Sequence, residues 1–137
     1  MKIHDIIVRK IFDSRGEPTI EVSLKTGNRW FSASIPSGKS RGSGETTVFS
    51  FAEAVRALAR IRRVILKKEF SSIRALDNAL IRLDNTKNKS RLGGNLMLGI
   101  SVAFARARAA AENKEVWQIL RKEFSPGDSK TKVPFIF

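Results

Sequence analysis

Residues 19–25 read Thr-Ile-Glu-Val-Ser-Leu-Lys, a strict alternation of polar and apolar side chains. Successive side chains of a β-strand point to opposite faces, so Ile20, Val22 and Leu24 would share one face. The polar residues between them would share the other face. The pattern therefore predicts a strand that is buried on one side and open to solvent on the other.

The runs on either side extend this strand into a sheet. Residues 3–12 are strand-like, and the segment Asp-Ser-Arg-Gly-Glu-Pro at 13–18 has the composition of a turn. Gly27-Asn28 suits a tight hairpin turn, and residues 30–35 alternate again. We expect a three-stranded antiparallel meander.

The hydrophobic period becomes helical after residue 50. The first predicted helix has a stripe at three- and four-residue spacing, made of Phe51, Val55, Leu58, Arg62 and Ile65. A second helix should begin at Ser71 or Ser72 as its N-cap. An alanine-rich helix over about 95–113, with Asn95 as its cap, should be the central buried one.

A fourth, short helix completes the domain. Its expected apolar anchors are Val116, Trp117, Ile119 and Leu120. Strands followed by helices predict an α+β domain, a three-stranded antiparallel β-meander followed by a bundle of about four helices. We place this domain at residues 1–125 and expect 126–137 to be a linker that ends in an apolar stub, Val-Pro-Phe-Ile-Phe.

Composition limits the chemistry. The chain has 137 residues, no cysteine and a single histidine, His4, so disulfides, thiolate metal sites and multi-histidine metal clusters are excluded. The formal net charge of +13 favours anionic partners. The beginning of the chain lacks the apolar stretch of a signal peptide, so we expect a cytoplasmic location.

Residues 37–45, Ser-Gly-Lys-Ser-Arg-Gly-Ser-Gly-Glu, contain no apolar side chain and predict a mobile surface loop of the kind that often carries function. Its Gly38-Lys39-Ser40 is not a P-loop, because that motif needs a glycine where Ala33 stands. No pair of carboxylates has a spacing that suggests acid–base catalysis, so we assign no catalytic residue.

Three separate motifs resemble those of one known family. The first is the opening hairpin at 13–22, Asp-Ser-Arg-Gly-Glu-Pro-Thr-Ile-Glu-Val. The second is a lid-like loop at 36–42, Pro-Ser-Gly-Lys-Ser-Arg-Gly. The third lies at 83–95, Leu-Asp-Asn-Thr-Lys-Asn-Lys-Ser-Arg-Leu-Gly-Gly-Asn, and the alanine-rich helix follows in the same order. In this order the motifs resemble those of enolase. The resemblance covers nearly the whole chain but only the N-terminal domain of an enolase, and 126–137 would lead into its C-terminal barrel.

The resemblance implies the dehydration of 2-phosphoglycerate to phosphoenolpyruvate with two magnesium ions, in glycolysis. The barrel carries the catalytic base, the proton donor and the metal-binding carboxylates of that family, so this chain alone would be inactive and would need a barrel domain or split partner chain. Ser40 would be a ligand of the second Mg²⁺, available only in complex with the barrel. The substrate lid would contain Ser37, Gly38, Lys39, Arg41 and Gly42.

The resemblance also implies a homodimer, in which Glu21 forms a cross-subunit ion pair and Arg15 lies beside the interface. The chain departs from the family pattern at Lys39 and Arg41, which replace an alanine and a threonine of the lid. An alternative function is a barrel-less enolase-like module that binds RNA or an acidic protein through its basic surface. A third is self-association through the surface that would face the barrel.

Overall fold

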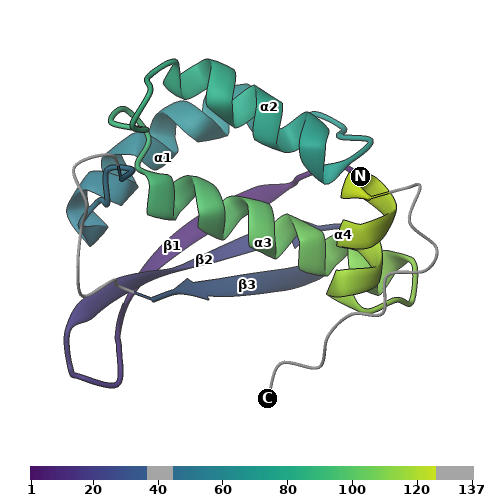
Figure 1. Ribbon diagram of the computed structural model, residues 1–137, viewed down its shortest axis with the longest axis horizontal. Coiled ribbons are helices and arrows are strands. Elements are labelled where there is room, and N and C mark those ends of the chain that lie inside the picture. The colour runs from purple at the N-terminus through teal and green to yellow at the C-terminus, as the bar shows by residue number, and fades with distance from the viewer. Residues whose placement is uncertain (37–44, 126–137) are drawn as a thin grey trace.

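The computed structural model describes residues 1–36 and 45–125, which form a small sheet with helices on one of its faces (Figure 1). The strands and helices are, in chain order, β1 (Asp5–Phe12), β2 (Pro18–Thr26), β3 (Arg29–Ile35), α1 (Phe51–Ile65), α2 (Ile73–Asp84), α3 (Gly94–Ala111) and α4 (Val116–Phe124). The predicted α+β class and its meander with four helices are confirmed.

The sheet has the order β1-β2-β3 and is antiparallel throughout. Val22 pairs with Val8 of β1 and with Ala33 of β3, which fixes the register. The predicted apolar face of β2 is confirmed, because Ile20, Val22 and Leu24 are at most 1% exposed and face the helices. Burial of these side chains supplies the main hydrophobic stabilisation of the sheet. The other face is less open than predicted, because Ser23 is also buried and its hydroxyl bonds to that of Ser32 at 2.6 Å.

The helix α3 is the centre of the domain and packs on β2, β3, α2 and α4. Gly99 permits this close approach, because a Cβ added there would lie 2.4 Å from Cγ2 of Val22. Phe104, fully buried on the same helix, meets the ring of Phe70 edge-on at 6.3 Å between centroids. The expectation of a central, alanine-rich helix is confirmed.

The buried face of α1 differs from the predicted stripe. Val55 is 44% exposed, and the buried positions are Ala54, Ala57, Leu58, Ile61 and Ile65. Small alanines face the sheet because they let the helix come close to β1, which the hydrophobic spacing did not reveal. Arg62 lies at the edge of this contact, where it pairs with Asp5 at 2.6 Å and donates to the carbonyl of Ile6.

The prediction for α4 was wrong at two of its anchors. Trp117 and Leu120 are 48% and 40% exposed, and within this helix only Ile119 is fully buried. Glu123 provides the second attachment of α4, because one carboxylate oxygen lies 2.9 Å from Nε of Arg108 on α3 and the other accepts the N–H of Ile73 at 2.7 Å. A polar contact therefore takes the role expected of apolar side chains.

Helix starts follow the expected capping chemistry in two cases and depart from it in a third. Ser50 and Glu53 form a reciprocal capping box at α1, and Ser72 caps α2. Asn95 is not the cap of α3: Gly93 occupies that position and Asn95 lies in the first turn. None of the helices in the described residues is long and apolar enough to cross a membrane.

Candidate functional site

The predicted lid residues Ser37, Gly38, Lys39, Ser40, Arg41 and Gly42 lie outside the residues that the structure describes. The structure does describe the two points between which they are connected. These are the end of β3 at Ile35 and the segment 45–50 that leads into α1. Residues next to both points line one hollow, Thr19 and Ile20 on one side and Val48, Phe49 and Ser50 on the other.

The end of β3 is held by β2. The hydroxyl of Thr19 donates a hydrogen bond to the carbonyl oxygen of Ile35, the last residue of β3. This bond is in addition to the ladder pair of Ile35 with Ile20. The chain therefore leaves the sheet from a fixed position.

The segment 45–50 is held by the start of α3. The N–H of Phe49 donates to Oδ1 of Asn95 at 2.9 Å, and Nδ2 of Asn95 donates to the carbonyl of Phe49 at 2.9 Å. Thr47 adds two backbone hydrogen bonds, each 2.7 Å long. Its N–H donates to the carbonyl of Asn88, and its carbonyl accepts the N–H of Gly94. The amide of Asn95 thus satisfies both backbone groups of one residue in a segment that has no regular secondary structure.

Two glycines make this contact sterically possible. A Cβ on Gly93 would lie 2.6 Å from Cγ of Phe49, and Gly93 also has a φ of +80°. A Cβ on Gly94 would lie 2.4 Å from Oγ1 of Thr46. The segment can lie against the start of α3 only because both side chains are absent.

Asp84 organises the connection that carries these glycines, and sequence reasoning missed it. Its carboxylate is fully buried and accepts the N–H groups of Thr86, Arg91 and Leu92 at 3.0, 3.1 and 2.8 Å, together with the hydroxyl of Thr86. Burial acts to raise the pKa of Asp84, but the bonds from Thr86, Leu92 and Arg91 outweigh it and hold the pKa below its ordinary value. An aspartate two residues before a threonine at a helix end was the available signal, since such side chains bond to the backbone that follows.

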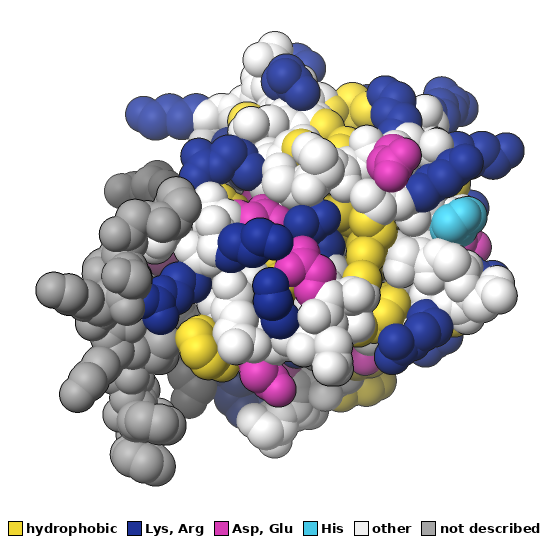
Figure 2. Space-filling view, turned by 90° about the vertical axis from the view of Figure 1, so that its right-hand side faces the viewer, with side chains coloured by type: hydrophobic (Ala, Val, Ile, Leu, Met, Phe, Trp, Pro, Cys, Tyr) yellow, Lys and Arg dark blue, Asp and Glu magenta, His cyan; other side chains and the backbone are white. Residues whose placement is uncertain are grey.

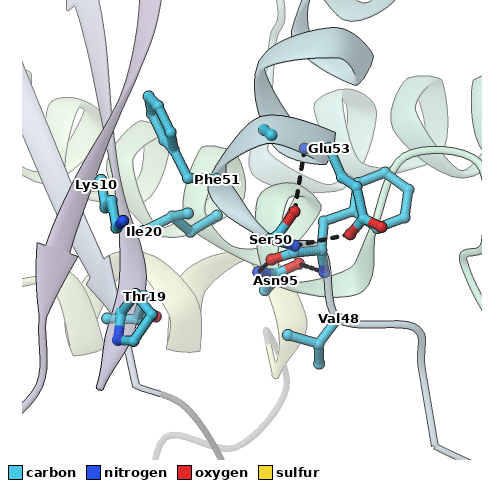
Figure 3. A pocket seen from close by; sticks show the side chains of 11 residues that line it. Lys10, Thr19, Ile20, Val48, Ser50, Phe51, Glu53 and Asn95 are labelled. Atoms are coloured by element: carbon cyan, nitrogen blue, oxygen red, sulfur yellow. Dashed lines mark hydrogen bonds between the residues drawn. The ribbon is translucent and has the colours of Figure 1, made fainter.

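A hollow of about 520 Å³ lies between the two attachment points (Figure 3). It is lined by Lys10, Pro18, Thr19, Ile20, Val48, Phe49, Ser50, Phe51, Ala52, Glu53 and Asn95. Lys10 is the lining cation, and the carboxylate of Glu53 is engaged by the N–H of Ser50 at 2.8 Å. The wall is mostly apolar, so the hollow has the character of a docking cleft for another surface more than that of a catalytic centre.

The described residues do not provide a magnesium site. In the two described stretches, no three Asp, Glu or His side chains are grouped closely enough to hold a metal ion. Mg²⁺ needs about six oxygen ligands, commonly including one or two carboxylates.

The two predicted interface residues lie at different places on the sheet. Arg15 is in the β1–β2 turn, where it pairs with Asp13 at 3.3 Å and with Glu17 at 3.5 Å. Glu21 lies on the face of β2 opposite the helices, where it accepts the hydroxyl of Ser34 at 3.2 Å and lies 3.8 Å from Nη1 of Arg9.

Several charged side chains are paired near α4. On the end of the molecule that carries α4, basic and acidic side chains lie side by side (Figure 2). Glu112 forms ion pairs with Lys114 at 2.9 Å and with Lys122 at 3.1 Å. Their hydrogen bonds lower the pKa of Glu112.

Comparison with known proteins gives the family. The enolase N-terminal domain family matches residues 3–120. The chain is similar to Enolase 1 of Chlorobaculum tepidum, with 40% identity over 133 residues that cover 88% of this chain and 31% of that protein. It is also similar to the enolase of Ehrlichia ruminantium strain Gardel, at 41% identity with 88% and 32% coverage, and to Enolase B of Dictyostelium discoideum, at 34% identity with 98% and 32% coverage. The chain spans about a third of the length of these relatives. This chain therefore belongs to the enolase N-terminal domain family.

Proposed function

We propose that this chain serves as the N-terminal part of an enolase and acts together with a C-terminal barrel domain in the dehydration of 2-phosphoglycerate. The observation that carries the proposal is the family match over residues 3–120, made to proteins about three times as long. In this proposal the barrel supplies the catalytic groups and the chain supplies the cover of the site. The chain is inactive alone.

The lid function is assigned to Ser37, Gly38, Lys39, Arg41 and Gly42, with Ser40 as a Mg²⁺ ligand. Support comes from the fixed ends of this segment, at Thr19–Ile35 and at Asn95–Phe49. These contacts hold in place the two points of the described structure that the segment connects. The ion itself supplies charge stabilisation in an enolase, and the other ligands must come from the barrel.

The dimer is a further part of the proposal. Glu21 is suited to a cross-subunit pair because its present partner, Arg9, is 63% exposed and its nitrogen is 3.8 Å away. Exposed pairs of that kind contribute between 0 and about 1 kcal/mol, so little is lost when the carboxylate changes partner. Arg15 would lie beside that interface.

A cytoplasmic location also belongs to this proposal, and fractionation of cells that express a tagged chain tests it.

Complementation tests the proposal. The purified chain is mixed with the barrel polypeptide of an enolase, and phosphoenolpyruvate formation is measured with Mg²⁺ present. We expect a rate above that of the barrel alone, and we expect Ser40→Ala to reduce it without weakening association of the two polypeptides. No increase over the barrel alone would contradict the proposal and would favour the barrel-less binding module.

A further inference from the structure

A second hollow, of about 370 Å³, lies on the outer side of α1. It is lined by Phe49, Glu53, Arg56, Ala57, Arg60, Ser90 and Arg91. Three arginines from two separate parts of the chain therefore border one concave surface. Together with Arg63, the next arginine along the exposed side of α1, we call Arg56, Arg60 and Arg91 the arginine face.

The arginines of this face have no acidic partner in the part of the chain that the structure describes. None of the ion pairs there involves Arg56, Arg60, Arg63 or Arg91. The nearby carboxylate of Glu53 is bonded to the backbone of Ser50. Arg62, by contrast, already has an acidic partner within the domain, Asp5. On the end of the molecule that carries α4, basic and acidic side chains also lie side by side (Figure 2). Glu112 pairs with both Lys114 and Lys122.

The arginine face is also linear. Arg56, Arg60 and Arg63 are spaced by four and three residues, so they lie along one side of α1 over about 10 Å. Residues 54–68 contain six basic residues and no acidic residue. Like charges at this spacing destabilise a helix slightly, and a bound anion would remove that cost.

The backbone that carries these side chains is fixed. Arg56, Arg60 and Arg63 are on a helix that begins with a complete capping box. The N–H of Arg91 is bonded to the buried carboxylate of Asp84 at 3.1 Å. Binding would therefore order only the side chains, which keeps its entropic cost low.

We propose that the arginine face binds the phosphate backbone of single-stranded nucleic acid. Guanidinium groups match phosphate oxygens with paired donors, and a row of them suits a chain that carries a charge at every unit more than it suits a single anion. The half-buried ring of Phe49 in the wall of the hollow offers a surface on which a base stacks. This inference does not depend on the proposed enolase function.

The test is fluorescence anisotropy of a labelled single-stranded RNA, titrated with the 137-residue chain at several salt concentrations. Four phosphate contacts predict a slope of log affinity against log salt of about −2.8, or a loss on the order of 50-fold between 50 and 200 mM salt. The variant R56Q/R60Q/R91Q should reduce the steepness of that slope by about 2. The single variant R60Q should reduce it by about 0.7, and it covers the case in which the triple variant does not fold.

The matched control is K2Q/R29Q/K114Q, which removes three exposed cations from other surfaces. Glu112 keeps Lys122 as a partner in this control. Full affinity in the control, together with the loss in the arginine-face variant, supports the proposal. Absence of binding at 50 mM salt, equal losses in both triple variants, or complete displacement of RNA by 10 mM inorganic phosphate would each overturn it. None of these results depends on whether a barrel polypeptide is activated.

Discussion

The side-chain amide of Asn95 forms two hydrogen bonds with the backbone of Phe49, each 2.9 Å long, and so joins the start of α3 to the segment that precedes α1. Forty-six residues separate the two. Asn95 is 8% exposed, so water cannot easily replace either bond. This contact fixes one end of the segment in which the enolase-like lid motif lies.

Asn95→Ala should lower the free energy of unfolding by about 1–3 kcal/mol, because two backbone groups of Phe49 lose their partner. Urea unfolding followed by circular dichroism measures the change. Asn78→Ala, at an exposed position of α2, is the matched control and should change stability by less than about 0.5 kcal/mol. Equal losses in the two variants would contradict the role given to Asn95.

Gly93→Ala should be more costly than Gly16→Ala. Both glycines have a positive φ, of +80° and +75°, so both substitutions strain the backbone by about 1 kcal/mol. At Gly16 nothing lies within 4 Å of the added Cβ, whereas at Gly93 the ring of Phe49 must move. We expect an additional loss of about 1–3 kcal/mol at Gly93, measured by the same unfolding experiment. Indistinguishable losses would show that the contact with Phe49 is not tight.

Asp84→Asn should destabilise the domain strongly at pH 7, because a neutral amide with one oxygen cannot replace a carboxylate that accepts four hydrogen bonds. The pKa of Asp84 is lowered on folding, so its contribution is complete above the unfolded-state pKa of 3.8 and is lost as the pH falls through the lower folded-state value. The difference between wild type and variant should therefore shrink below pH 3.8. A difference that does not vary with pH would contradict this account.

Asp77→Asn is the variant matched to Asp84→Asn, because folding shifts the pKa of Asp77 in the opposite direction. Burial raises the pKa of Asp77 and Glu123 raises it further, while the hydrogen bond with Ser101 only partly offsets them. Because the pKa of Asp77 is higher in the folded state, its contribution to stability is fully present below the unfolded-state pKa of 3.8. The contribution is lost as the pH rises through the folded-state pKa, and the ionised carboxylate then disfavours the folded state. The amide should therefore be at least as stable as wild type at pH 7 and should lose this advantage in acid. Thermal melts over a pH series measure both aspartates together, and a destabilised Asp77→Asn at pH 7 would be the contrary result.

Ile119→Ala should cost about 2–5 kcal/mol, because this fully buried side chain is the main apolar attachment of α4. Leu120→Ala, which trims a 40% exposed neighbour, should cost less than about 1 kcal/mol. Chemical denaturation distinguishes the two. Similar losses of stability in the two variants would contradict the main role given to Ile119 and would support Leu120 as an anchor.

The meander was predictable for two reasons. Apolar residues at every second position, such as Ile20, Val22 and Leu24, share one face only if the segment is a β-strand, and turn residues lie between the strands. The exact face of α1 was not predictable from spacing. Alanine is compatible with both buried and exposed positions. The sequence therefore did not indicate that Ala54 and Ala57 would be buried in place of Val55. Packing distance to the sheet decided between them.

The surroundings of the candidate site were less predictable than the fold. The lid-like motif and the third motif were recognisable as sequence, but the buried state of Asp84 depends on donors up to eight residues away. The bond between Asn95 and Phe49 joins distant parts of the chain, and no local pattern encodes it. The predictions for Ser40 and its neighbours, and for Glu21 and Arg15 at a dimer interface, stay predictions.

The most direct measurement is the rate of phosphoenolpyruvate formation by an enolase barrel polypeptide as increasing amounts of this chain are added with Mg²⁺. The account predicts a rise that saturates with chain concentration, is reduced by Ser40→Ala and requires more chain when Asn95 is replaced by alanine. A rate that stays at the level of the barrel alone at every concentration would contradict it.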